Sequence, residues 1–379
     1  MLTLTVWHCV LLLAYSTNRD SHIVVDRYRQ RRDRVLRALV EARRVPFLTR
    51  DPATIRYLTG LVSSHALLVL DGHRITLITD GRYQDQAHAT GLEVVINKDL
   101  IAAALPLVLE LSVEFSVVVD AAIAAGDIDR LRQSGITVSI DDRTLAECRQ
   151  VKDSDECDSL TKACAITVEA LLHVVPEIKV GDTEIHIARR LEQAFGEFGA
   201  HDRAFPTIVA SGAHSAQPHH RPTHTPIAPG DLLVIDCGAL VDGYHADMTR
   251  TFVVGAEPAT WQRLMHDVVL SAQEAGRRAA VPGIRASEID ARVRGVVEAA
   301  GLGDEFTHGT GHGVGLEIHE APMVSATSGY TISAGTPITI EPGVYRPGQG
   351  GVRIEDTVVV DNPTRVLTEA PRDLMTVGR

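Results

Sequence analysis

The chain has 379 residues, and its 49 acidic and 37 basic side chains give a formal net charge of −12 at pH 7. Such an acidic balance excludes a protein that binds the nucleic-acid backbone through a basic surface. The length exceeds one ordinary hydrophobic core and predicts two domains. The five cysteines are scattered without a CxxC pair, which indicates reduced thiols and a cytoplasmic protein.

The first 21 residues contain a short apolar run but lack a basic start and a small-x-small cleavage pattern. They do not match a secretory signal, and we expect a leader that is disordered or peripheral. No later stretch is apolar for long enough to indicate a membrane span.

Alternating helical and strand-like stretches follow the leader. An arginine-rich helix is expected within 26–45, and helical segments separate five strand-like runs at 47–49, 66–70, 75–79, 93–96 and 116–120. This alternation is typical of an α/β domain, which we place at 22–145. The domain contains no cluster of catalytic residue types.

The pattern changes to long amphipathic helices in the second domain, residues 146–379. Two pairs of helices are expected, at 154–175 with 183–199 and at 259–279 with 287–300. Ser287 and Asp290 form a plausible capping box for the last of these helices.

The two halves of this second domain resemble each other. PGDLLVIDCG at 229–238 matches AGTPITIEPG at 334–343, and the starts of the second helix of each pair match at nearly the same offset. Similarity at a fixed offset indicates an internal duplication. The sequence therefore predicts an α+β domain with pseudo-twofold symmetry.

Four carboxylates occupy corresponding positions in the two halves. Asp236 ends an apolar strand-like run, and Asp247 follows eleven residues later, after a glycine-containing turn that suits a hairpin. The duplication pairs Asp236 with Glu341 and Asp247 with Glu355. Taken alone, Asp236 and Asp247 also fit an alternative interpretation, in which one acid lies in a turn and the other pairs with Arg250. Four acids brought together would repel one another unless cations neutralise them.

A nitrogen ligand for such cations is offered by the glycine-rich stretch HGTGHGVGLEIHE at 308–320. His308 and His312 lie in one loop, and His319 follows a short strand-like run. Glycines at this spacing permit close approach of the backbone.

The second domain resembles the pita-bread metallopeptidases, which include methionine aminopeptidase, aminopeptidase P and prolidase. IRYLTG at 55–60 and DGRY at 80–83 are similar to the creatinase-type N-terminal domain, so the resemblance covers about 22–370. It implies five metal ligands: Asp236, Asp247, His312, Glu341 and Glu355. Two of them, Asp247 and Glu355, bridge the ions. This oxygen-rich set favours two divalent ions, with Mn²⁺ first and Co²⁺, Fe²⁺ or Zn²⁺ as alternatives.

The same resemblance implies a mechanism in which a hydroxide that bridges the metals attacks the peptide carbonyl. Glu341 would move the proton between that water and the departing amine. His219, in SAQPHHRPT, matches a histidine that binds substrate and stabilises the tetrahedral intermediate, whereas His220 is the expected bystander.

Three further residues receive roles from the resemblance. His308 and His319 match pocket histidines that donate to the developing oxyanion. Arg353 matches an arginine that supports a metal ligand or binds a substrate carboxylate. Cys237 is flanked by apolar residues and is expected to be buried packing, not a nucleophile.

The first domain disfavours methionine aminopeptidase, and the complete ligand set disfavours creatinase, which uses no metal. Because Xaa-Pro is a tertiary amide that needs a dedicated pocket, we expect an Xaa-Pro dipeptidase resembling the short bacterial prolidases. An Xaa-Pro aminopeptidase on longer peptides is the alternative, and a binding module without catalysis is a remote one. The expected partner is a small peptide with proline in second position, with no nucleic acid and no membrane, and the resemblance implies a homodimer.

Overall fold

The computed structural model describes residues 19–112 and 114–378. The predicted leader lies outside this part, except for Arg19–Ser21, which begin helix α1 (Arg19–Glu41). Contacts divide the chain into two compact units with a boundary between Leu145 and Ala146. Helix α6 (Thr144–Gln150) crosses that boundary.

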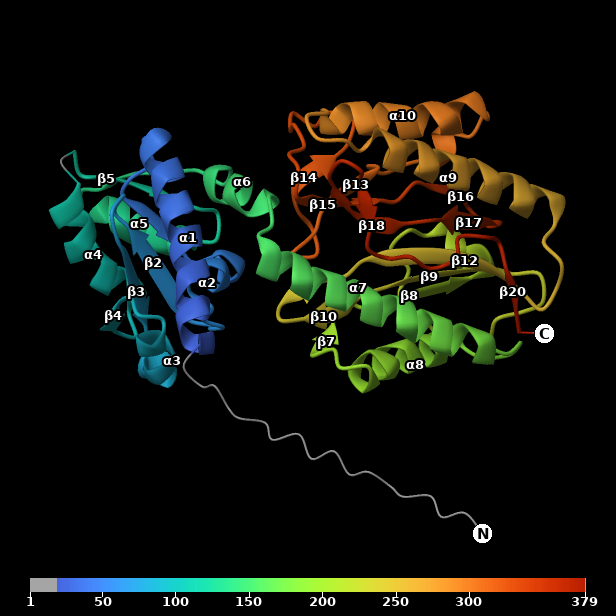
Figure 1. Ribbon diagram of the computed structural model, residues 1–379, viewed down its shortest axis with the longest axis horizontal. Coiled ribbons are helices and arrows are strands. Elements are labelled where there is room, and N and C mark those ends of the chain that lie inside the picture. Colours follow the sequence, from blue (N-terminus) through green and yellow to red (C-terminus); the bar gives the residue numbers. More distant parts are fainter. Residues whose placement is uncertain (1–18, 113, 379) are drawn as a thin grey trace, which may run out of the picture. The chain divides into compact units, whose positions relative to one another are not determined.

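The N-terminal unit is built on one six-stranded sheet in the order β4-β3-β2-β1-β5-β6 (Figure 1). The pairs β1–β2 and β2–β3 are antiparallel, and the others are parallel. All five predicted strands are present, and β6 is an additional one. The strands are β1 (Phe47–Thr49), β2 (Ala66–Leu70), β3 (Ile75–Thr79), β4 (Glu93–Ile96), β5 (Ser116–Val119) and β6 (Thr137–Ile140).

Helices pack on this sheet because their apolar faces match the buried sides of the strands. Leu67 and Ile78 of the sheet form one cluster with Ala104 and Val108 of helix α4, all at 0% exposure. Besides α1, the helices are α2 (Pro52–Thr59), α3 (Gln84–Ala89), α4 (Leu100–Leu111) and α5 (Ala125–Gln133).

The C-terminal unit has two pairs of helices on opposite sides of its strands (Figure 1). The pairs are α7 (Ser154–Val174) with α8 (Glu184–Glu197), and α9 (Thr260–Ala279) with α10 (Ala286–Ala299). The segment Ser154–Glu177 reaches the length and hydropathy of a membrane span, contrary to the sequence-based expectation, but half of its apolar window is buried in the unit. It is the central core helix, with Leu160 and Cys164 at 0% exposure.

Two main sheets repeat one arrangement between the helix pairs. They run β20-β12-β9-β8 and β14-β13-β15-β18-β19, and smaller sheets run β11-β10-β7 and β16-β17. In each half a central antiparallel pair carries the acids: β9 pairs with β12, and β15 with β18. The predicted duplication is therefore visible in the fold. The strands are β7 (Asp202–Arg203), β8 (Ile208–Ser211), β9 (Leu232–Cys237), β10 (Ala239–Val241), β11 (Tyr244–His245), β12 (Met248–Val254), β13 (Gly311–Gly313), β14 (Glu320–Val324), β15 (Thr336–Ile340), β16 (Gly343–Arg346), β17 (Gly350–Arg353), β18 (Asp356–Val360), β19 (Arg365–Val366) and β20 (Thr376–Val377).

The predicted helix cap is confirmed for α8 and wrong for α10. Thr183 caps α8 by accepting from the backbone N–H of His186. Helix α10 begins earlier than expected and has Arg285 at its N-cap without a side-chain cap. The capping box of Ser287 and Asp290 is therefore wrong, because Asp290 is buried and accepts a hydrogen bond from Thr310 Oγ1 at 2.8 Å.

Candidate metal centre

The four acids lie at the ends of the paired strands. Asp236 is on β9 opposite Thr249, and Asp247 immediately precedes β12. Glu341 follows β15, and Glu355 immediately precedes β18. Because β9 pairs with β12 and β15 with β18, each half presents two carboxylates at one strand-pair end.

The turn predicted between Asp236 and Asp247 is present as a small hairpin of its own. β10 and β11 pair through Leu240 with His245, and Asp242 and Gly243 form the turn with φ of 49° and 80°. Two successive positive φ values are the signature of a type I′ hairpin turn, which favours Asp-Gly.

Strand β13 carries His312 into the centre between two glycines. A Cβ atom at Gly311 would lie 2.0 Å from the backbone oxygen of Thr339, and one at Gly313 would lie 2.3 Å from that of Ala321. Only glycine permits these approaches. The glycines let β13 pack between β14 and β15 and bring His312 beside the acids.

The structure brings all five predicted ligands to one cavity of about 510 Å³. Ligand atoms of Asp247, His312 and Glu355 all lie within 4.8 Å of one another. His312 Nε2 lies 3.4 Å from Glu341 Oε1 and 3.6 Å from Asp247 Oδ2. Asp236 lines the same cavity.

The electrostatics of this cluster require compensation by cations. Burial, as the main cause, and repulsion from neighbouring carboxylates, as the second, raise the pKa of Asp247 and of Glu355 far above the usual range. Burial also raises the pKa of Glu341 to about 7 and lowers that of His312 to about 4. Asp236 Oδ1 and Glu355 Oε1 are buried and have no hydrogen-bond donor among the described residues. Unpaired carboxylate oxygens beside a neutral imidazole fit divalent cations.

Arg353 supports the cluster from the protein side. Its Nη2 donates to Asp236 Oδ2 at 2.7 Å, its Nε to Thr249 Oγ1 at 3.0 Å, and its Nη1 to the Tyr345 hydroxyl at 2.9 Å. The side chain is only 4% exposed. Of the two predicted roles, this geometry favours support of the ligand Asp236.

His308 lines the cavity with both ring nitrogens engaged. Nδ1 lies 2.8 Å from the Gly309 carbonyl oxygen, so it carries the proton, and Nε2 accepts from the Tyr345 hydroxyl at 2.9 Å. Burial lowers the pKa of His308 to about 4, which keeps the ring neutral. His308 therefore has no N–H free for an oxyanion, and the predicted donor role does not fit this geometry. Tyr345, which orients His308 and Arg353, was missed because nothing in its sequence context signals such a contact.

His219 and His319 line the cavity and are exposed to it. Neither ring makes a hydrogen bond to another of the described residues, and His319 meets His312 edge to face at 4.4 Å between ring centroids. Their ring nitrogens are available to a bound substrate. The apolar wall of the cavity was not predicted and consists of Phe205, Pro206, Ile208, Ile318 and Met323.

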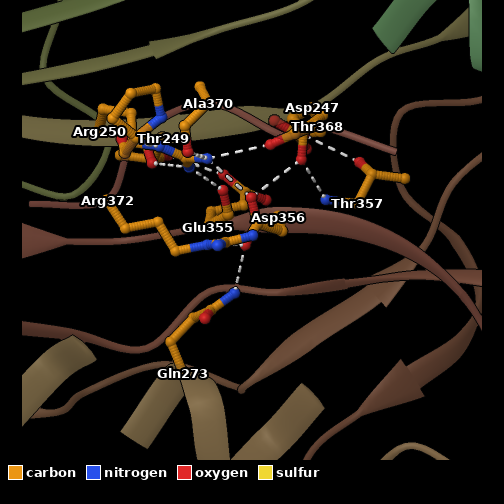
Figure 2. A network of polar contacts seen from close by, with 11 residues as sticks. Asp247, Thr249, Arg250, Gln273, Glu355, Asp356, Thr357, Thr368, Ala370 and Arg372 are labelled. Atoms are coloured by element: carbon orange, nitrogen blue, oxygen red, sulfur yellow. Dashed lines mark hydrogen bonds and ion pairs between the residues drawn. The ribbon is translucent and has the colours of Figure 1, made fainter. Parts of the chain in front are cut away.

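The alternative interpretation paired an acid of this stretch with Arg250, but Arg250 does not pair with Asp247. Its Nη2 binds Asp356 Oδ1 at 2.8 Å in a buried network that joins the two halves (Figure 2). The backbone oxygen of Asp247 instead accepts from Thr357 Oγ1 at 2.8 Å. Asp247 therefore keeps its carboxylate for the centre. Cys237 is buried at 0% exposure, as expected for packing.

Comparisons with known proteins match both units of the chain to known families. Residues 158–362 match the metallopeptidase family M24, and residues 31–141 match the creatinase/prolidase N-terminal domain. The chain is 43% identical over 235 residues to an Xaa-Pro dipeptidase of Pyrococcus furiosus, which covers 62% of this chain and 67% of that protein.

Solved structures resemble nearly the whole chain. An Xaa-Pro dipeptidase from Bacillus anthracis superposes with a TM-score of 0.87 at 31% identity, over 92% of this chain and 100% of that one. An X-Pro aminopeptidase from Thermotoga maritima gives a TM-score of 0.79 at 32% identity, over 89% and 99%. The chain belongs to the metallopeptidase family M24 and has its two-domain, creatinase-like architecture with a pita-bread C-terminal domain.

Proposed function

We propose that this metallopeptidase hydrolyses the Xaa-Pro bond of dipeptides. The observation that carries the proposal is the convergence of five metal-ligand side chains on one cavity that also has an apolar wall and two unengaged histidines. The names of the relatives in Pyrococcus furiosus and Bacillus anthracis favour a dipeptidase. Because the Thermotoga maritima relative is named an X-Pro aminopeptidase, that activity is the alternative for this chain.

The residues that would hold two divalent cations are Asp236, Asp247, His312, Glu341 and Glu355. Four carboxylates and one imidazole form an oxygen-rich set, so we propose Mn²⁺ ahead of Co²⁺, Fe²⁺ or Zn²⁺. When bound, the cations supply the Lewis acidity that activates water and polarises a carbonyl.

Glu341 is the group that would move the proton. Hydrolysis breaks the bond between carbonyl carbon and proline nitrogen, and the departing nitrogen must gain a proton. The Glu341 side chain is 19% exposed and faces the cavity, and its Oε1 lies beside His312 Nε2. A carboxylate in reach of both water and substrate can accept a proton from the one and deliver it to the other.

His219 and His319 would donate ring N–H groups to the substrate carbonyl oxygen as negative charge develops on it. An Xaa-Pro bond has no N–H of its own, so recognition must come from the carbonyl and from the proline ring. The apolar wall, with Phe205, Ile318 and Met323, suits that ring.

The decisive comparison is between Ala-Pro and Ala-Pro-Ala with purified protein and added Mn²⁺. A dipeptidase hydrolyses Ala-Pro with the higher kcat/KM, whereas a preference for Ala-Pro-Ala assigns the chain to the aminopeptidases. If both peptides stay intact, the peptidase proposal fails.

We further propose a homodimer in the cytoplasm. Cys157, Cys164 and Cys237 of the described part of the chain are free thiols, which suits a reducing compartment. Sedimentation equilibrium tests the dimer, for which a mass near twice 41.0 kDa is expected. A mass that stays at one chain would exclude it.

A further inference from the structure

Glu184 is a buried carboxylate outside the metal centre that accepts six hydrogen bonds. It is the first residue of α8, and its side chain is 0% exposed. Oε1 accepts from Ser211 N at 2.8 Å, Ser211 Oγ at 3.0 Å and His214 Nδ1 at 2.9 Å. Oε2 accepts from His220 Nε2 at 2.9 Å, Thr223 N at 3.0 Å and Thr223 Oγ1 at 2.8 Å.

All six donors belong to one segment, residues 211–223. The segment leaves β8 at Ser211, passes through a 3₁₀ turn at Gly212–Ala216 and carries His219 into the cavity. Glu184 holds it on both sides of His219, at residues 211, 214, 220 and 223. The stretch after the turn is not part of a sheet, so few ladder bonds order it. The bonds to Glu184 add to the backbone bond from Ile185 N–H to the Thr223 carbonyl oxygen at 3.0 Å and to the bond from Arg353 Nη1 to the Pro218 carbonyl oxygen at 3.3 Å.

Glu184, His214 and His220 are close enough to resemble a second metal site, since their ligand atoms lie within 4.8 Å of one another. The hydrogen bonding argues against it. A carboxylate offers about four lone-pair directions, and six donors already occupy both oxygens. The two ring nitrogens that face Glu184 are the protonated ones, so they cannot also ligate a metal. The cluster is therefore an anchor made of hydrogen bonds.

The charge of Glu184 is part of that anchor. Burial alone would raise the pKa of this carboxyl, but hydrogen bonds, led by the one from His220, hold the pKa at about 2. An ionised acceptor binds N–H and O–H donors more strongly than a neutral amide does. His220, expected to be a bystander, is thus one of the contacts that fix its neighbour His219.

We propose that Glu184 is a positioning residue that holds residues 211–223 so that the His219 ring faces the substrate cavity. This inference rests on the proposed function of His219 in substrate binding. Glu184→Gln keeps the size of the side chain but replaces one acceptor oxygen by an NH₂ group that faces three donors. The anchor should then loosen while the apolar face of α8 stays intact.

A double-mutant cycle in the Mn²⁺-loaded full chain separates positioning from a general structural effect. Glu184→Gln should lower kcat/KM for Ala-Pro on the order of 10-fold to 100-fold. In the His219→Ala background the same change should have almost no further effect, because both changes act through one ring. Equal losses in the two backgrounds would overturn the proposal. The matched control is Glu197→Gln, an exposed position on the same helix that accepts a hydrogen bond from Gln193 Nε2 at 2.7 Å.

Hydrogen exchange supplies a readout that needs no activity. The Ser211 and Thr223 amides donate to different oxygens of Glu184, so Glu184→Gln should lower the protection of at least one of them while amides within α7 keep theirs. Unchanged protection at both amides would overturn the anchor. If the wild-type chain cleaves no Xaa-Pro peptide, the proposed function fails and exchange still decides the role of Glu184. Should Glu184→Gln fail to fold, His220→Ala, which removes one donor and keeps the carboxylate, goes through the double-mutant cycle with the same deciding outcome.

Discussion

Arg250 and Asp356 form a buried ion pair that joins the two halves of the C-terminal unit, with 2.8 Å between Nη2 and Oδ1. Arg250 lies on β12 and Asp356 begins β18, and their side chains are 2% and 0% exposed. Arg250 Nη1 also donates to the backbone oxygen of Glu355 at 2.6 Å (Figure 2). The pair therefore fixes the backbone of one candidate metal ligand from the opposite half.

Replacing Arg250 by methionine should lower the free energy of unfolding of the C-terminal unit by about 3 to 5 kcal/mol. The change leaves Asp356 buried with one cation fewer and takes the donor from the carbonyl oxygens of Glu355, Thr368 and Ala370. Denaturant unfolding followed by circular dichroism measures the loss.

Arg263→Met is the matched control for this prediction. Arg263 pairs with Glu257 at the surface, where the two side chains are 54% and 71% exposed. Surface pairs of this kind contribute about 0 to 1 kcal/mol. If both variants lost the same small amount of unfolding free energy, the Arg250 network would not be what joins the halves.

Tyr345→Phe should lower kcat/KM for Ala-Pro on the order of 10-fold without loss of fold. The hydroxyl donates to His308 Nε2 and accepts from Arg353 Nη1, both at 2.9 Å, so its removal frees two cavity side chains. Steady-state kinetics measure the effect. Tyr83→Phe, which removes a hydroxyl bonded to Ser64 in the N-terminal unit, is the control and should leave kcat/KM unchanged. Equal rates for wild type and Tyr345→Phe would contradict this role.

Asp120→Asn should stabilise the N-terminal unit above neutral pH and have no such effect near pH 4. Burial raises the pKa of Asp120 to about 6 from an ordinary value of 3.8. The folded state therefore holds a proton that the unfolded state releases, so stability falls as pH rises from about 4 to 6 and then levels off. Asparagine cannot ionise and avoids this loss, which amounts to about 2 to 3 kcal/mol.

The measurement is the difference in unfolding free energy between wild type and Asp120→Asn across pH 4 to 8. Asp129→Asn is the control, because Asp129 is 64% exposed on the same unit, and its effect should stay within about 0.5 kcal/mol. A stabilisation by Asp120→Asn that grows toward acid would have the wrong sign for this account.

The convergence of the four carboxylates could be predicted because their positions depend on local patterns that repeat, whereas His312 was assigned through the family resemblance. Each half has a buried strand that ends on an acid, and the near-constant offset between Asp236 and Glu341 marks the duplication without any knowledge of contacts. Five of the six strands of the N-terminal unit followed equally from apolar runs and turn residues.

Contacts between distant segments could not be predicted in this way. Glu184 meets donors 27 to 39 residues away, and Tyr345 meets His308 37 residues away. A single sequence carries no period or spacing that reports such pairs. The capping box at Ser287 failed for the same reason, since Asp290 is drawn instead to Thr310, 20 residues along the chain.

Metal content and Ala-Pro hydrolysis of the chain before and after chelation, with Asp236→Ala beside wild type, decide whether the carboxylate cluster is a catalytic metal centre. We expect two divalent ions per wild-type chain, loss of hydrolysis on chelation and its return with Mn²⁺. Asp236→Ala should stay folded, bind less metal and show no turnover. Hydrolysis that survives complete removal of metal, or full activity in Asp236→Ala, would contradict the account.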